Sequence, residues 1–252
     1  MGENTMTTLY RKSEITFAVL WIAAYVILTS IADELSAAAG VVKSVTAALH
    51  IVMSLILFHW IRANQLSRKY GLCRSEVPAR RFLYYLPLII IVVIPFLKGI
   101  GMKYSLPETI LYFVSMCCVG FLEEVIFRGL LFRAMEKDNL KSAIIVSSLT
   151  FGIGHIVNLF NGSGRSTAES LVQIVFAVLV GFVLVLIFYH GKSLIPCILF
   201  HSANNAFRVF AAEGSLNPAT ELIINLVIIV VVLGGYLLYL LKTFPLKEDH
   251  LR

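Results

Sequence analysis

Charged residues are scarce in this sequence. Asp, Glu, Lys and Arg make up only 14% of its 252 residues, whereas hydrophobic residues make up 58%. An ordinary soluble domain has about 25% charged residues, and folding leaves roughly a quarter or more of the chain's surface exposed to solvent. The composition therefore excludes a normal water-soluble enzyme, because so many apolar side chains must face lipid.

Linkers, cysteine frameworks and basic stripes are lacking as well. No stretch rich in Gly, Ser or charge divides the chain, so we predict a single transmembrane domain over residues 1–252. The four cysteines form no CxxC pair, which argues against a disulfide framework and a cysteine-bound metal. The basic residues behind the net charge of +6 are scattered between apolar stretches, so nucleic acid is not an expected partner.

Long apolar stretches recur along the whole chain. A transmembrane helix needs about 20 mainly apolar residues, and the pattern predicts an all-α polytopic membrane protein with about eight transmembrane helices. The third stretch is short and contains Pro87 and Pro95, so a kink is expected there. The expected spans are approximately 15–31, 44–61, 82–97, 106–132, 142–160, 168–189, 193–210 and 219–241.

The basic residues predict the orientation. The first apolar run is longer than the core of a signal peptide, so it is expected to be retained as a span. With that span in place, 15 of the 21 Lys and Arg residues fall on the side of the termini. Lys and Arg are enriched on the cytoplasmic side of membrane proteins, so both termini are predicted to be cytoplasmic. The other side carries Lys43, Lys98, Lys103, Arg165 and Arg208.

Two carboxylates lie where a membrane disfavours them. Of 15 acidic residues, only Glu123 and Glu124 lie well inside an apolar span, and a charged group there costs several kcal/mol. Arg128 follows Glu124 by four residues, so a structural ion pair explains Glu124. It leaves Glu123 unexplained, because adjacent helical residues point about 100° apart.

Two other spans contain polar groups at a similar depth. His155 lies in one, and His201 and Asn205 are one helical turn apart in another. Each histidine alone can be a hydrogen-bonded core residue. Together with Glu123, however, all lie near the middle of a bilayer about 30 Å thick. A carboxylate, two imidazoles and an amide at one depth can activate water and stabilise a tetrahedral oxyanion.

Small and polar residues around these groups have less specific interpretations. Gly120, Gly152 and Gly154 allow close helix packing or leave room for a ligand, and both alternatives stay open. His50 and His59 are nine residues apart and face opposite sides of a helix, so they are predicted to be non-catalytic. Two more polar residues in the spans match no motif, Gln173 and Asn158.

The polar residues fit three short motifs in order. EExxxR reads Glu123, Glu124 and Arg128; FxxxH reads Phe151 and His155; HxxxN reads His201 and Asn205. In this arrangement the sequence resembles the CAAX-processing and bacteriocin-processing intramembrane endopeptidases, the CPBP or Abi family. The resemblance covers a motif-bearing core of about residues 106–210, and the outline of eight spans is also similar.

The resemblance implies peptide-bond hydrolysis in a cavity open towards the cytoplasm or inner leaflet. Glu123 and His155 would position and activate water, and His201 and Asn205 would stabilise the oxyanion. In supporting roles, Glu124 and Arg128 would hold the motif helix or help the site, and Phe151 would pack beside it.

The resemblance leaves a metal cofactor open, since family members have been described both as metalloproteases and as glutamate-dependent proteases. Zinc accepts His and carboxylate ligands, so a bound zinc would use Glu123, His155 and His201. The HExxH arrangement is absent and the amide of Asn205 is a poor zinc ligand, which favours chemistry without a metal.

The motifs do not single out one substrate. The expected partner is a peptide or protein, with a lipidated tail, a peptide pheromone or a bacteriocin precursor as candidates, besides membrane lipid. The compact chain is more similar to prokaryotic members, which indicates a prokaryotic plasma membrane. One alternative is a non-proteolytic immunity or scaffold protein that binds through the same cavity. A transporter is another, although no internal repeat supports it.

Overall fold

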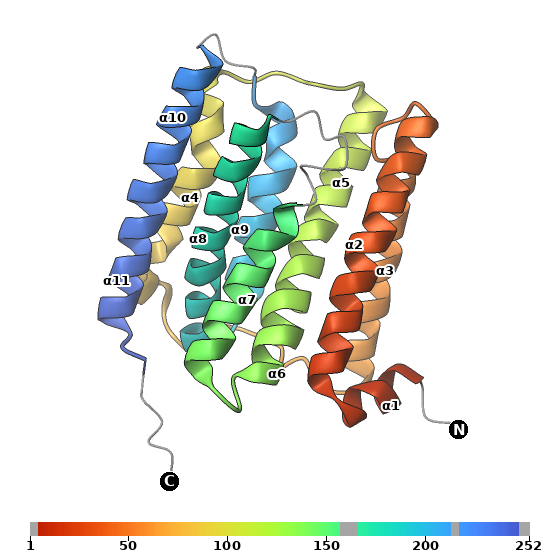
Figure 1. Ribbon diagram of the computed structural model, residues 1–252, viewed down its shortest axis with the longest axis vertical. Helices are drawn as coiled ribbons and strands as arrows, with labels where there is room; N and C mark the ends of the chain where they lie inside the picture. Colours follow the sequence, from red (N-terminus) through yellow and green to blue (C-terminus); the bar gives the residue numbers. More distant parts are fainter. Residues whose placement is uncertain (1–4, 157–165, 213–216, 247–252) are drawn as a thin grey trace.

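The computed structural model describes residues 5–156, 166–212 and 217–246, and every regular element in these ranges is helical (Figure 1). Six helical stretches are long and apolar enough to cross a membrane, which confirms the all-α polytopic class. They are α2 (Glu14–Ala38), α3 (Ser44–Ala63), the stretch Ala79–Lys98 that contains α4 (Leu86–Val93), the stretch Leu106–Met135 that starts with α5 (Leu106–Glu123), α8 (Thr167–Gly191), and the stretch Ala219–Thr243 in α10 (Pro218–Ile229) and α11 (Gly235–Thr243).

Two of the expected spans are shorter helices. They are α7 (Leu140–Gly154) and α9 (Ile195–Ala206), which continues into a 3-10 turn at Phe207–Phe210. The span predicted there reaches residue 160 and includes Asn158, but residues 157–160 lie outside the described ranges. His155 is the C-cap of α7, and His201 lies within α9.

Of the two prolines in the third span, only Pro95 lies at an irregular part of the helix. The helix α4 changes to a 3-10 helix at Ile94–Lys98, which contains Pro95, so the expected irregularity is confirmed there. Pro87 instead lies in the first turn of α4, where its missing N–H costs no helical hydrogen bond.

Apolar residues divide between an interior and an outer surface. Leu122, Ile126 and Phe188 are fully buried in the core, whereas Leu55 and Val231 are more than 60% exposed. Exposed apolar side chains on α3 and on the stretch that joins α10 to α11 fit a surface covered by lipid.

Glycines allow close approach at two of the positions singled out in the sequence. A Cβ at Gly120 would lie 2.5 Å from the Ser202 nitrogen, and one at Gly152 would lie 3.1 Å from the Val178 nitrogen. Close packing therefore explains both residues. A Cβ at Gly154 would meet nothing within 4 Å, so Gly154 faces open space instead.

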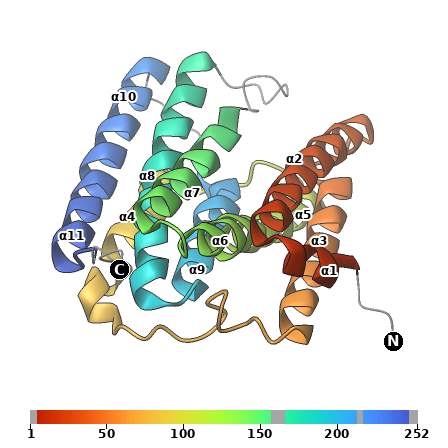
Figure 2. The same cartoon turned by 60° about the horizontal axis from the view of Figure 1, so that its bottom comes forward.

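The two ends of the bundle differ in charge. The short helix α1 (Thr5–Lys12) lies at one end, and the connection from α3 to α4 runs across the same end (Figure 2). We name this the basic end, because its segments contain most of the described Lys and Arg residues: Arg11, Lys12, Arg62, Arg68, Lys69, Arg74, Arg80, Arg81, Arg133, Lys137, Lys141, Lys192 and Lys242. The opposite end carries Lys43, Lys98, Lys103 and Arg208.

Candidate active site

The two adjacent carboxylates lie at a change of helix type. Glu123 is the last residue of α5, and Glu124 is the first residue of a π-helix (η3, Glu124–Phe132). Short π-helical segments within α-helices are frequent at functional sites. All residues of this segment are buried, so both its ion pair and its apolar side chains lie inside the protein.

Glu124 and Arg128 form the ion pair that the sequence predicts. Arg128 Nη1 donates to Glu124 Oε1 over 3.1 Å, and both side chains are completely buried. The guanidinium carbon of Arg128 also lies 4.0 Å from the centre of the Phe151 ring. The pair therefore ties the π-helix to α7 through Phe151.

His201 lies between the two carboxylates. Its Nδ1 is 2.8 Å from Glu124 Oε1, and its Nε2 is 3.4 Å from Glu123 Oε2. Because a carboxylate oxygen accepts hydrogen bonds, Nδ1 is the donor to Glu124. The Phe151 ring meets the His201 ring edge-on at 5.6 Å, so the imidazole is held from two sides.

Glu123 has a partner that the sequence analysis missed. Tyr25, in α2, donates its hydroxyl to Glu123 Oε1 over 2.7 Å. The other oxygen, Oε2, is buried and makes no hydrogen bond. Tyr25 thus fixes one oxygen of Glu123 and leaves the second facing His201. A tyrosine within an apolar span is ordinary, so no sequence signal could have singled it out.

His155 and Asn205 complete the set from two helix ends. His155 caps the C-terminus of α7, and its Nδ1 lies 3.1 Å from the Phe151 carbonyl oxygen. Since a carbonyl oxygen only accepts, Nδ1 is the donor in this contact, and Nε2 carries the lone pair of the neutral ring. Asn205 Oδ1 accepts from Asn204 Nδ2 over 3.2 Å.

Asn204 was also missed, although the adjacent amides in α9 were visible in the sequence. Its side chain is buried, and its Oδ1 has no hydrogen-bond partner. An orphaned buried amide oxygen is costly, so this atom is ready to accept a hydrogen bond from a ligand or water.

These side chains share a cavity of about 930 Å³. The sequence-predicted residues on its wall are Glu123, Phe151, Gly154, His155, Gln173, His201 and Asn205, and the structure adds Tyr25 and Asn204. Glu124 and Arg128 are not on the wall, in keeping with their buried pair. Several helices, including the N-terminal α2, therefore bring a tyrosine hydroxyl, a carboxylate, two imidazoles and three amides to one cavity within the bundle.

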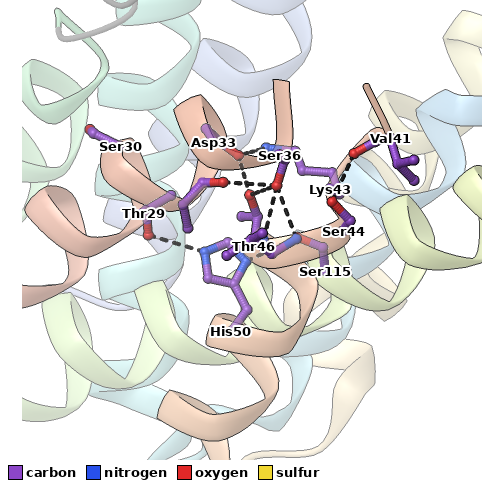
Figure 3. A network of polar contacts seen from close by, with 12 residues as sticks. Thr29, Ser30, Asp33, Ser36, Val41, Lys43, Ser44, Thr46, His50 and Ser115 are labelled. Carbon is purple, nitrogen blue, oxygen red and sulfur yellow. Dashed lines mark hydrogen bonds and ion pairs between the residues drawn. The ribbon is translucent and has the colours of Figure 1, made fainter. Parts of the chain in front are cut away.

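A second polar cluster supports the wall beside Tyr25 (Figure 3). His50 is fully buried, with Nε2 at 3.1 Å from Thr29 Oγ1 and Nδ1 at 3.0 Å from Ser115 Oγ. Its ring lies 5.9 Å from that of Tyr25. His59 is exposed, so the predicted opposite facing of the two histidines is confirmed. Both ring nitrogens of His50 contact hydroxyl groups of neighbouring helices, so this histidine connects α3 to α2 and α5.

A metal does not fit the residues as they are arranged. Among the described residues, no group of three or more His, Cys, Asp or Glu side chains could hold a metal ion. Glu123 and His201 approach each other, and the Nδ1 contacts of His201 with Glu124 and of His155 with a carbonyl oxygen leave Nε2 as the nitrogen that each ring could offer to a metal. The two rings and Glu123 nevertheless do not form such a group in this arrangement.

Comparison with known proteins identifies the domain. Residues 105–207 match the family model described as type II CAAX prenyl endopeptidase Rce1-like. No curated protein and no solved structure gives a match. The matched segment contains all three motifs, whereas Tyr25 and His50 lie N-terminal to it. Residues 105–207 therefore form an Rce1-like domain, which is consistent with a membrane protease of the CPBP family.

Proposed function

We propose that this protease hydrolyses a peptide bond inside the membrane with a water molecule activated by Glu123 and His155. The observation that carries the proposal is the position of the Glu123 carboxylate. Its Oε1 is held by Tyr25, and its Oε2 is buried without a hydrogen bond at the wall of the cavity. A carboxylate oxygen in this state is a suitable general base.

The reaction begins with water between Glu123 and His155. Glu123 Oε2 takes a proton from water, His155 Nε2 accepts its second hydrogen bond, and the oxygen attacks the peptide carbonyl carbon. A C–O bond forms and the carbonyl electron pair moves to oxygen. The proton on Glu123 then passes to the peptide nitrogen, the C–N bond breaks, and a carboxyl and an amine product remain.

The oxyanion needs hydrogen-bond donors placed in advance. Asn205 supplies its amide N–H, and His201 supplies Nε2–H when its ring carries both protons. The contact of His201 Nδ1 with Glu124 sets the direction in which Nε2 points. One such donor contributes roughly 3–4 kcal/mol to transition-state stabilisation. Glu124 and Arg128 act by positioning, since neither reaches the cavity.

The substrate is a peptide or protein, and we propose a lipidated tail, a peptide pheromone or a bacteriocin precursor. The family description supports a processed tail, and the cavity is large enough for several residues. We further propose a prokaryotic plasma membrane with both termini in the cytoplasm. Under that orientation, the residues that line the open end of the cavity lie at the non-cytoplasmic end, away from the cytoplasmic opening that the family resemblance implies.

Cleavage in a defined membrane tests the proposal. The purified protein in liposomes is incubated with a fluorogenic peptide library that includes lipidated members, and products are identified by mass spectrometry. Glu123→Gln and His155→Ala should lower cleavage at least 1,000-fold, about 4 kcal/mol. Glu34→Gln, which changes an exposed carboxylate near the end of α2, is the matched control.

Two results would count against the proposal. Cleavage by Glu123→Gln at the wild-type rate would show that Glu123 is not the general base. Uptake of a solute by the liposomes, with no cleavage by the wild type, would favour the transporter alternative.

A further inference from the structure

The cavity reaches one end of the bundle. Its wall begins at Tyr25 and Glu123 and continues to side chains at the end opposite α1. At that end it is lined by Asp33, Lys43, Lys98, Lys103, Arg208, Ala212 and Glu221. No described residue of segments 5–24, 62–81, 133–141 or 189–196, which lie towards or at the basic end, lines it.

Packed side chains close the cavity towards the basic end. Phe127 and Phe200 lie on its wall and are at most 7% exposed. Beyond them, Leu130, Phe132 and Phe188 are fully or almost fully buried. A polypeptide or bulk water could cross this layer only if the core opened, because protein interiors leave few voids larger than a water molecule.

The mouth of the cavity is polar. Lys43 pairs with Asp33 over 2.7 Å, and Lys98 pairs with Glu221 across the rim. Lys103 is exposed beside them. Charged groups of both signs suit an opening to water and to the polar backbone of a peptide.

The distribution of Lys and Arg residues predicts which side of the membrane this mouth faces. Lys and Arg are enriched in short cytoplasmic loops, and their bias sets the orientation. Within the described ranges, the basic end holds 13 of the 18 Lys and Arg residues. The mouth lies at the other end, so the charge rule and an opening towards the cytoplasm cannot both hold.

We propose that the mouth faces the non-cytoplasmic side, so that the proteolytic site takes its substrate from outside the cytoplasm. The substrate class is an exported peptide or an extracytoplasmic segment of a membrane protein that enters as an extended chain. This inference rests on the proposed proteolytic function for its substrate, but the accessibility of the cavity is a separate property of the fold.

Cysteine labelling in intact cells tests the side of access. Single cysteines are introduced by Lys103→Cys at the mouth, Gly154→Cys within the cavity and Arg68→Cys at the basic end. The background has alanine in place of the four native cysteines, Cys73, Cys117, Cys118 and Cys197. Gly154 has open space around its Cβ position, and Arg68 is 88% exposed. Cells are treated with a small cationic methanethiosulfonate that does not cross membranes, and the unsubstituted background is the control.

The proposal expects labelling of Lys103→Cys and Gly154→Cys in intact cells, at least tenfold above the background. Arg68→Cys should react only after the cells are permeabilised. The reverse pattern would overturn the orientation. Reaction of Lys103→Cys without Gly154→Cys would overturn the open route to the site.

Failure of the proteolytic function gives a different result. In that case Gly154→Cys is labelled from outside as expected, while Glu123→Gln and the wild type give the same products. The two claims are therefore tested independently.

Discussion

Replacing Tyr25 with Phe tests the geometry of the general base. The change removes one hydroxyl and keeps the ring that lies beside His50. The lost hydrogen bond, 2.7 Å long, goes to a carboxylate, and Glu123 then has no hydrogen bond from any described residue. Hydrogen bonds to charged groups contribute about 1.5–3 kcal/mol. If this bond positions Glu123 for the reaction, kcat should fall roughly 10- to 150-fold.

The assay is steady-state cleavage in liposomes, with kcat and KM measured separately and thermal unfolding followed in parallel. A positioning role predicts a lower kcat with KM within about threefold of wild type. Tyr104→Phe is the matched control, because Tyr104 also lines the cavity but lies at its mouth. Wild-type kcat in Tyr25→Phe, alongside an inactive Glu123→Gln, would refute the reasoning.

The other predictions concern the stability of the site's framework. Arg128→Ala leaves the fully buried Glu124 without its cation, so unfolding in detergent should require about 3–5 kcal/mol less free energy; unfolding like the wild type would contradict the buried pair. Gly120→Ala forces a methyl group to within 2.5 Å of the Ser202 nitrogen and should cost about 1–3 kcal/mol. Gly154→Ala, with open space around its Cβ position, should unfold like the wild type, and equal losses for the two glycine variants would argue against the helix packing described.

The sequence predicts the local part of the site well. Glu124 and Arg128 are four residues apart, and that spacing gives their ion pair directly. The scarcity of charge singles out Glu123, because so few ionisable groups lie in apolar spans. His155, His201 and Asn205 follow from the same reasoning, and all reach one cavity.

Features that depend on packing between distant helices are harder to predict. Tyr25 is 98 residues from Glu123 in the chain, and its hydroxyl finds the carboxylate only through the contact of α2 with the π-helix. The π-helix itself has no distinct composition. The apolar run of the α9 span likewise does not show that the α-helix changes to a 3-10 turn at Phe207–Phe210, because hydropathy does not mark where the helix type changes within a protein interior.

The direction of the cavity likewise depends on tertiary structure. The positions of the motif residues along their spans predict a depth near the middle of the membrane, but they do not predict towards which side the cavity opens. The arrangement of Lys43, Lys98 and Lys103 around the mouth appears only when the helices are assembled.

The most direct test of the central claim compares peptides from cells that produce the wild-type protein or Glu123→Ala at equal levels in the membrane. Mass spectrometry of membrane and secreted fractions should find at least one product pair in the wild type alone. The intact precursor should accumulate in Glu123→Ala. Identical peptide profiles, with the same precursors cleaved at the same bonds in both strains, would contradict proteolysis by a Glu123-activated water.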